Sequence, residues 1–399
     1  REIANRGIEA FDGRCRPFDE AANGTNIGDG FVTIVLKRKD LAVRDQDYIH
    51  GVVLGSAINS DGASNGLTAP NPESQADVLC RAWDDAGIKP ERIKFIETHG
   101  TGTKLGDPIE IHGLTAAARK YTKQTQFMAL SGTKANIGHL EATAGIAGFL
   151  KALLCVKHRY LPTILHYKKP NPYIDFKSSP VFVPDQVIQW DAPGAEIIAG
   201  ISSFGITGTN SHVVLAGYDN VTHANEVAAA QQVVFVSAKS VSALLGNLAK
   251  YRELCSDDLD LAALSYSTAV RCDHYPHRMA LIAPTPAQLK QTLDQVLSQF
   301  ADAEALTSLP EHGAYYANTE NGDMLTVNGA GLSAEQLLMV EDFLSDSPIE
   351  WQDSQGAGNF MPLPSYSFDA LRCWPKLTID KALEQENRIK DLFYQIVWR

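Results

Sequence analysis

The sequence predicts an α/β fold in which a largely parallel β-sheet is covered by helices on both faces. Short apolar segments rich in Val and Ile, typical of buried strands, alternate with longer segments typical of helices. Polar loops that follow several of these strands carry His99, Lys134 and His139. Active residues of such folds collect at the carboxyl ends of the strands, so we expect these three side chains at one edge of the sheet.

The elements expected in the first 218 residues follow a loop-like, Gly-rich stretch that ends near residue 30. Asn71 and Pro72 open a helix, which Gly87 ends. In order along the chain, we expect strands at 31–37 and 48–57, a helix at 71–86, a strand from Ile93, a helix after Asp107, a strand at 127–131, a helix at 140–156, and strands at 197–203 and 211–217.

The loop that carries His99 leads into a helix with a recognisable N-terminal pattern. Asp107 suits the N-cap, Pro108 suits the first helical position, and Glu110 completes a capping box. Another Gly-rich turn, at 202–210, joins the last two strands and is expected to hold Phe204. Each polar loop is therefore bounded by regular elements that would fix its position.

The segment from Ser131 to His158 is the most informative stretch of the chain. It begins as a loop of Gly, Thr, Lys, Asn and His, a composition typical of functional loops. It continues as a helix of small and apolar residues that we expect to be buried on nearly all sides. Gly145 and Gly148 would each cost about 1 kcal/mol in an exposed helix, so close backbone packing is their expected use. His139 lies at the entrance of this helix, where the helix dipole favours a neutral ring.

A second, smaller α/β unit is expected after a linker-like change of composition to Ala, Gln, Asn and Val. His274 and His277 form an HxxH pair, but no third ligand is near, which favours a solvated turn over a metal site. The expected elements of this unit are a strand at 233–237, helices at 241–254 and 259–270, a strand at 278–283 and a helix at 287–300.

Composition and charge exclude several classes of function. The chain has 399 residues, of which 44% are hydrophobic and 21% charged, as in a globular protein with a large core. The net charge of −12 argues against nucleic acid or an anionic membrane as a general partner. No apolar run reaches the length of a membrane span. The six cysteines are scattered without CxxC pairs, which suits reduced thiols in a cytoplasmic protein.

Three long motifs carry a resemblance to a known family. The motifs ETHGTGTKLGDPIE at 97–110, GTKANIGHLEATAGIAGFLK at 132–151 and SSFGITGTNSHVVL at 202–215 resemble the ketosynthase (β-ketoacyl synthase) domains of modular polyketide synthases. CRPFDEAANGT from Cys15 and GSAINSDGASNGLTAPN from Gly55 resemble the same family. The resemblance implies a thiolase-like, layered α-β-α fold, represented here by its C-terminal half and followed by a small α/β linker domain.

The resemblance also implies the order of parts along the chain. The two pieces of the linker lie roughly sixty residues apart, which is too short for an acyltransferase domain, and no GxSxG nucleophile elbow occurs. The implied acyltransferase therefore acts in trans. The implied parts are the C-terminal half of a ketosynthase domain at 1–218, a linker at 219–232, an α/β post-ketosynthase linker domain at 233–305, the remainder of the linker at 306–377 with a returning LPSYSF segment, and the start of a following domain at 378–399.

The chemistry implied by the resemblance is a decarboxylative Claisen condensation, so the family is one of acyltransferases. A cysteine holds an acyl chain as a thioester, and two histidines bind the carbonyl of a malonyl-type unit on the phosphopantetheine arm of an acyl-carrier protein. By match to the motifs, the catalytic residues are His99, His139 and Lys134, the pantetheine-binding residues are Thr101 and Thr103, the gating residues are Phe204 and Gly205, and Glu141 is a further candidate for the network.

The resemblance implies no bound cofactor and no metal, since the phosphopantetheine arm is a substrate carrier. The implied partners are an acyl-carrier protein, a second copy of the intact synthase in a homodimer, and the acyltransferase. The acidic carrier would need local basic clusters, and the best candidates are Lys157 and Arg159 together with Lys168 and Lys169.

The nucleophilic cysteine segment, a Thr-Ala-Cys-Ser run in this family, is absent from this sequence. Cys15 is a poor substitute in a loop without catalytic counterpart, although Arg14 and Arg16 are expected to lower its pKa. Asp29 stands where the family usually has Glu. The chain alone is therefore expected to be inactive.

Several alternatives remain open at this stage. A thiolase would need a second cysteine near the turn at 202–210, and none is there. A non-catalytic docking or scaffold fragment, or the complementing half of a split ketosynthase, also fits the sequence. His99 and His139 could also be two unrelated structural histidines, in which case they would lie apart with separate partners.

Overall fold

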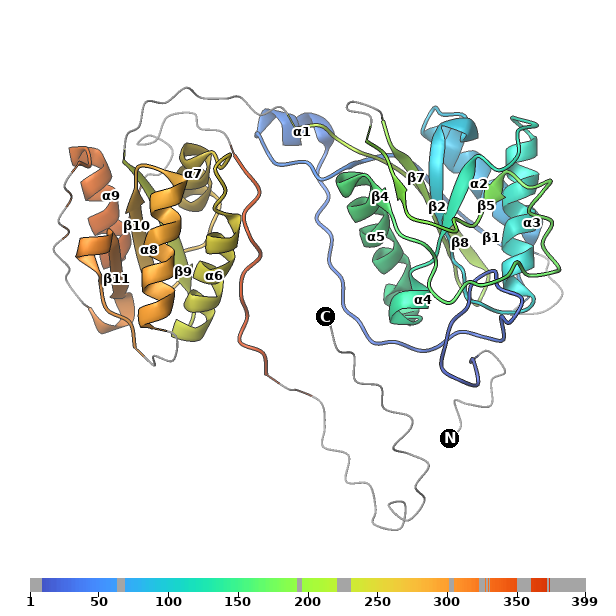
Figure 1. Ribbon diagram of the computed structural model, residues 1–399. Helices are drawn as coiled ribbons and strands as arrows, with labels where there is room; N and C mark the ends of the chain where they lie inside the picture. Colours follow the sequence, from blue (N-terminus) through green and yellow to red (C-terminus); the bar gives the residue numbers. More distant parts are fainter. Residues whose placement is uncertain are drawn as a thin grey trace, which may run out of the picture. The chain divides into compact units, whose positions relative to one another are not determined.

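The chain folds into two compact units, residues 1–223 and 224–399 (Figure 1). The computed structural model describes residues 9–62, 69–191, 196–220, 231–300, 305–322, 327, 329, 331–349, 360–371 and 373. The expected start of a further domain at 378–399 lies outside the described residues.

The first unit is built on a six-stranded mixed sheet. Strands β7, β2, β3 and β5 run parallel to one another, whereas β8 pairs antiparallel with both β1 and β7. The sheet is therefore less parallel than predicted, because the short turn after Phe204 makes β7 and β8 a hairpin. In spatial order the strands are β1 (Val52–Ser60), β8 (Thr209–Ala216), β7 (Ile198–Phe204), β2 (Ile93–Glu97), β3 (Met128–Ser131) and β5 (Val181–Phe182).

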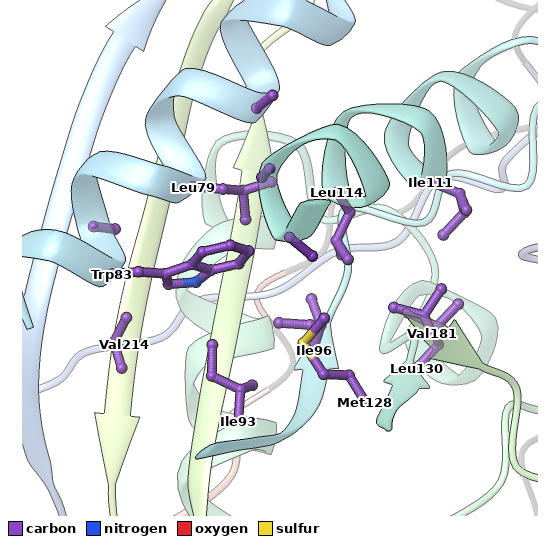
Figure 2. Close-up of a cluster of buried hydrophobic side chains, with 14 of the residues drawn as sticks. Leu79, Trp83, Ile93, Ile96, Ile111, Leu114, Met128, Leu130, Val181 and Val214 are labelled. Carbon is purple, nitrogen blue, oxygen red and sulfur yellow. The ribbon is translucent and has the colours of Figure 1, made fainter. Parts of the chain in front are cut away.

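Helices cover both faces of this sheet. Helices α2 (Pro72–Asp85) and α3 (Gly106–Arg119) pack on one face, around Trp83, Leu114 and the other side chains in Figure 2. Helix α5 (Ala144–His158) packs on the other face, against β7. The remaining elements of this unit are α1 (Lys39–Arg44), α4 (Lys134–Ile137), and the paired strands β4 (Tyr160–Leu161) and β6 (Ile188–Gln189).

Two predictions about burial are wrong, and both concern apolar surface. Residues 31–37 do not form a strand, and Phe31 and Val35 are 91% and 92% exposed. Helix α5 is not buried on nearly all sides, because Ile146, Leu150 and Leu154 are 36–45% exposed. These three residues are spaced by four and so lie on one face of the helix. The apolar residues are as the sequence patterns indicated, but the described residues leave Phe31 and Val35 almost uncovered and cover the three residues of α5 only in part.

The second unit is a three-stranded antiparallel sheet with helices on both faces. Its strands lie in the order β11–β10–β9, with α6 and α8 over one face and α9 over the other. The predicted elements are confirmed within two residues at each end, whereas β11 and α9 were not predicted. The bounds are β9 Gln232–Ala238, α6 Val241–Leu254, α7 Leu261–Val270, β10 His277–Ala283, α8 Pro286–Gln299, β11 Ala314–Asn318 and α9 Ala334–Ser345.

Residues 360–371, here called the return segment, lie along the second unit as predicted. The apolar side chains of Met361, Leu363 and Tyr366 pack against its core. The backbone N–H of Ser367 donates to Asn247 Oδ1 at 2.6 Å, and Asn247 Nδ2 donates to the carbonyl of Ser237 at 3.2 Å. Asn247 on α6 therefore joins the return segment to strand β9. Trp374, which was expected to join this contact, lies outside the described residues.

We predict that Asn247→Ala lowers the free energy of unfolding by about 1–3 kcal/mol, because it removes the side-chain partner of the half-buried Ser367 N–H and of the Ser237 carbonyl. The return segment should then be cleaved faster by proteases, which mass spectrometry of the fragments would locate. Ser298→Ala is the control, since the hydroxyl of Ser298 donates to the carbonyl of Gln295 on the exposed side of α8. Equal cleavage rates in the wild type and Asn247→Ala would contradict this role.

Candidate active site

The candidate residues meet because they follow three neighbouring strands. His99 comes two residues after β2, Lys134 comes three residues after β3, and Phe204 is the last residue of β7 rather than part of the turn. Strands β7, β2 and β3 are adjacent and parallel, so their carboxyl ends lie at the same edge of the sheet. The fold thus brings together loops that are far apart in the sequence.

The rings of His99 and His139 are in contact. Their centroids lie 5.7 Å apart with an interplanar angle of 83°, and the ring of Phe204 lies 5.7 Å from that of His99. The predicted proximity of the two histidines is confirmed, and two unrelated histidines with separate surroundings are excluded.

The backbone around His99 fixes which ring nitrogen carries the proton. The N–H of Phe204 points to His99 Nδ1 at 3.3 Å, so Nδ1 is the acceptor and the proton of the neutral ring sits on Nε2. Burial lowers the pKa of His99 well below its usual value, and the charge of Lys134 lowers it further. His99 is therefore a neutral donor at Nε2.

His139 is arranged in the same way by a different backbone group. The N–H of Glu141 donates to His139 Nδ1 at 2.9 Å, which again leaves the proton on Nε2. Glu141 takes a left-handed φ of +49° to present this N–H, while its side chain is exposed. What Glu141 contributes to the ring of His139 is therefore its backbone N–H.

The neutral state of His139 is as expected, but its cause differs. Its pKa is lowered to about 4 by burial and then by the charge of Lys134. Helix α5 begins only at Ala144, beyond a single 3₁₀ turn at Glu141–Thr143. Burial and Lys134, rather than the helix dipole, therefore account for the neutral ring.

Lys134 is 7% exposed and reaches the loop of His99. Its Nζ donates to the backbone carbonyl of His99 at 2.5 Å. Burial lowers the pKa of Lys134, whereas the buried carboxylates of Glu97 and Glu110 raise it. The lysine thus connects helix α4 to the loop of His99, and its positive charge lowers the pKa of both histidines.

Asp107 and Glu110 do not form the predicted capping box. Helix α3 begins at Gly106, whose N–H donates to Thr103 Oγ1 at 3.1 Å. The carboxylate of Glu110 instead accepts the N–H groups of His99 and Gly100, at 2.8 and 2.9 Å. Burial raises the pKa of both acids to about 7. The spacing of Asp107 and Glu110 matched a capping box, but both carboxylates instead accept N–H groups of the loop that carries His99.

Asp107 connects the same loop to the N-terminal part of the chain. Its carboxylate accepts the N–H of Gly102 at 3.0 Å and the N–H of Phe18 at 2.7 Å. The backbone of Asn26 in turn accepts the N–H of His139 at 2.6 Å. Residues before 30 therefore help to hold both histidine loops, which the sequence did not indicate, because isolated polar residues in a Gly-rich loop carry no periodic signal.

Cys15 lies in this N-terminal part, in a buried position. Its side chain is 2% exposed, and burial raises its pKa to about 12. The charge of Arg16 does lower this pKa as predicted, but burial outweighs it and the net shift is upward. All six cysteines are free thiols.

The remaining candidates border the site. The hydroxyls of Thr101 and Thr103 lie 3.2 Å apart, and both residues are half-buried. Gly205 closes the β7–β8 turn, where its N–H donates to the carbonyl of Thr209 at 2.7 Å. A side chain at Gly205 would meet that carbonyl oxygen at 3.3 Å, so the turn is tight.

The two histidines of the HxxH pair in the second unit have different partners. The rings of His274 and His277 contact different groups, the carbonyl of Ala269 and the hydroxyl of Tyr316. Within the described ranges, no group of three His, Cys, Asp or Glu side chains could hold a metal ion. None of the helices in those ranges is long and apolar enough to cross a membrane.

Comparison with known proteins agrees with this geometry. Residues 50–168 match the family described as beta-ketoacyl synthase, C-terminal domain, and residues 170–282 match the ketoacyl-synthetase C-terminal extension. Residues 2–42 match the beta-ketoacyl synthase, N-terminal domain. The chain belongs to the ketosynthase family of polyketide synthases. The predicted family is thereby confirmed.

Among curated relatives, this ketosynthase chain is 37% identical over 306 residues to polyketide synthase PksL of Bacillus subtilis, which covers 74% of the chain and 7% of PksL. It is 32% identical over 386 residues to polyketide synthase PksM of the same organism, covering 92% of the chain and 9% of PksM. The chain thus spans less than a tenth of the length of these relatives.

Solved ketosynthases share its fold. The ketosynthase from module 6 of the bacillaene synthase of Bacillus subtilis 168 superposes with a TM-score of 0.79 at 32% identity, over 94% of this chain and 67% of that one. The oxazolomycin ketosynthase domain OzmH KS7 of Streptomyces albus gives 0.78 at 29% identity, over 94% and 63%. The predicted thiolase-like fold is confirmed.

We predict that Glu110→Gln disturbs the His99 loop although it preserves size. The amide offers one acceptor oxygen to two N–H donors, so one donor loses its partner at a cost of about 1–3 kcal/mol in unfolding free energy. Glu196→Gln is the control, because it removes only an exposed ion pair with Arg92. Equal thermal unfolding of the two variants would contradict the role assigned to Glu110.

Proposed function

We propose that this chain supplies the decarboxylation machinery of a ketosynthase that joins an acyl thioester to a malonyl-type extender. The observation that carries the proposal is the pair of neutral histidines, each with Nδ1 occupied by a backbone N–H. Both rings therefore have an N–H donor free of these contacts, and the rings touch. One small acceptor, such as a thioester carbonyl oxygen, could bind both donors.

Charge develops on this oxygen during the reaction. Loss of CO₂ breaks the bond to the α-carbon of the malonyl unit, and the electron pair of that bond forms an enolate. Two neutral N–H donors stabilise the enolate oxygen, and one such donor is worth about 2.7–4 kcal/mol. The enolate carbon then attacks the carbonyl carbon of the acyl thioester, and the cysteine sulfur leaves as a thiolate.

The other residues take supporting parts in this proposal. Lys134 holds the His99 backbone and lowers the pKa of both histidines. Thr101 and Thr103 bind the phosphopantetheine arm through their hydroxyls. Phe204 gates the site from the end of β7 together with Gly205, and the N–H of Phe204 sets the tautomer of His99. No bound cofactor is needed.

In this proposal the acyl-holding cysteine belongs to the part of the ketosynthase N-terminal domain that residues 2–42 do not include. The exposed apolar faces support this: Ile146, Leu150 and Leu154 on α5, and Phe31 and Val35 before α1. Such surface is costly in water and marks a contact with another part of a protein. The alternative is a free-standing scaffold fragment. Such a fragment would gain nothing from exposing this apolar surface on a unit that also carries the paired histidines.

The proposed partners are an acyl-carrier protein, a second copy of the intact synthase, and an acyltransferase that acts in trans. Of the two basic clusters, the pair Lys168 and Lys169 suits the carrier better. Their backbone N–H groups donate to Asp19 in the N-terminal part that contacts the site. Lys157 and Arg159 lie at the far end of α5, about 20 Å along the helix from its start at Ala144.

We predict that the isolated chain forms no stoichiometric acyl adduct when incubated with an acyl-pantetheine donor. Cys15 is buried with a raised pKa, so it has neither access nor thiolate character. Intact-mass measurement checks this. An adduct on one cysteine together with ketide product would overturn the assignment of the nucleophile to another segment.

We predict that His99→Ala and His139→Ala each lower kcat for condensation about 10²–10³-fold in a synthase with both ketosynthase halves, because each removes one oxyanion donor. Transfer of the acyl group to the cysteine should continue, since it needs neither donor. Radiolabelled acyl loading and product formation are measured separately. Variants that condense at the wild-type rate would refute the proposed function.

A further inference from the structure

A buried polar cluster between the sheet and α5 is not used by the mechanism above. Its centre is Glu97, the last residue of β2, which is 1% exposed. One carboxylate oxygen, Oε1, accepts both the backbone N–H and the hydroxyl of Thr133, each at 2.7 Å. Glu97 precedes His99 by two residues and Thr133 precedes Lys134 by one. A single oxygen atom therefore links the loop of His99 to the helix of Lys134.

The other oxygen of Glu97 has no hydrogen-bond partner among the described residues. Lys151 Nζ forms an ion pair with Oε2 at 3.6 Å, beyond the 2.7–3.2 Å of a hydrogen bond, and this buried nitrogen has no hydrogen-bond partner either. The hydroxyl of Ser131 is a third such atom, in a fully buried residue. Ser131 is the register partner of Glu97 in β2 and β3, so both side chains emerge on the same face of the sheet.

The three atoms come from β2, β3 and α5, and α5 approaches closely here. A Cβ added at Gly148 would lie 3.2 Å from Glu97 Cγ, so this glycine lets the helix sit directly against the carboxylate. Buried polar groups in folded proteins nearly always have a partner, and a buried water typically makes about three hydrogen bonds. A water that accepts from Lys151 and donates to Glu97 and Ser131 would satisfy all three groups.

We propose that Glu97, Ser131 and Lys151 form a binding site for one buried water, and that Glu97 is a positioning residue for His99 and Lys134. The occupant is neutral, because the Lys151 ammonium already supplies the positive charge opposite the carboxylate. The water braces Oε2 and thereby holds Oε1 on Thr133. The positioning role rests on the proposed function, whereas the water site does not.

A crystal structure of this chain tests the site itself. We expect density for a single oxygen within hydrogen-bond distance of Glu97 Oε2, Ser131 Oγ and Lys151 Nζ, and loss of that density in Ser131→Ala combined with Lys151→Met. Direct contact between Lys151 Nζ and Glu97 with no density between them would overturn the water site. Short contacts typical of a metal ion would overturn it too.

Kinetics of a synthase with both ketosynthase halves test the positioning role. Glu97→Gln should lower kcat for condensation about 10-fold and leave acyl loading of the cysteine unchanged, because only the malonyl step uses the two histidines. Glu196→Gln is the matched control. Equal losses in both steps would mean a general structural effect and reject the positioning role, as would no loss at all. Wild-type condensation by His99→Ala would instead reject the proposed function.

If Glu97→Gln fails to fold, Thr133→Val carries the same test. It removes the hydroxyl that donates to Glu97 Oε1 and keeps the backbone N–H and the shape of the side chain. We expect the same selective loss in the condensation step. Its absence would reject the positioning role of Glu97.

Discussion

The site depends on the donation of one backbone N–H to Nδ1 of each histidine. Phe204 supplies it to His99 from the end of β7, and Glu141 supplies it to His139 from a left-handed turn. A neutral imidazole has one donor and one acceptor, so occupying Nδ1 in this way directs the proton to Nε2 in both rings. Burial and the charge of Lys134 then keep the rings neutral. The backbone contacts fix the position of the proton, and the lowered pKa keeps each ring neutral. Both effects are needed for each histidine to present a neutral N–H donor at Nε2.

The surrounding structure holds the two loops through buried acids. Asp107, Glu110 and Glu97 each accept two hydrogen bonds. Asp107 joins Phe18 to Gly102, Glu110 binds the adjacent N–H groups of His99 and Gly100, and Glu97 binds the N–H and the hydroxyl of Thr133. A carboxylate offers several acceptor positions to N–H groups that converge on it, whereas an apolar side chain would leave them unsatisfied. This explains why acids are buried beneath a site that itself needs no negative charge.

The sequence predicted the parts of this arrangement that follow from periodicity and family motifs. It identified the strand ends that carry His99, Lys134 and His139, and the contact between the rings. It misassigned Asp107 and Glu110, because a capping box and an inward-facing acid pair have the same spacing. Its prediction of burial for residues 31–37 and for most of α5 was wrong. An apolar pattern shows that a surface needs a partner, but it does not show which residues supply that partner.

The tautomer of the two histidines tests this account most directly. Long-range ¹H–¹⁵N spectra of the imidazole rings, recorded on the chain from pH 8 to pH 5, report the protonation of each nitrogen. We predict that His99 and His139 both remain neutral with the proton on Nε2 at pH 5.5, although a free imidazole is mostly charged below its usual pKa of about 6.5. Either ring protonated on Nδ1, or charged at that pH, would contradict the account.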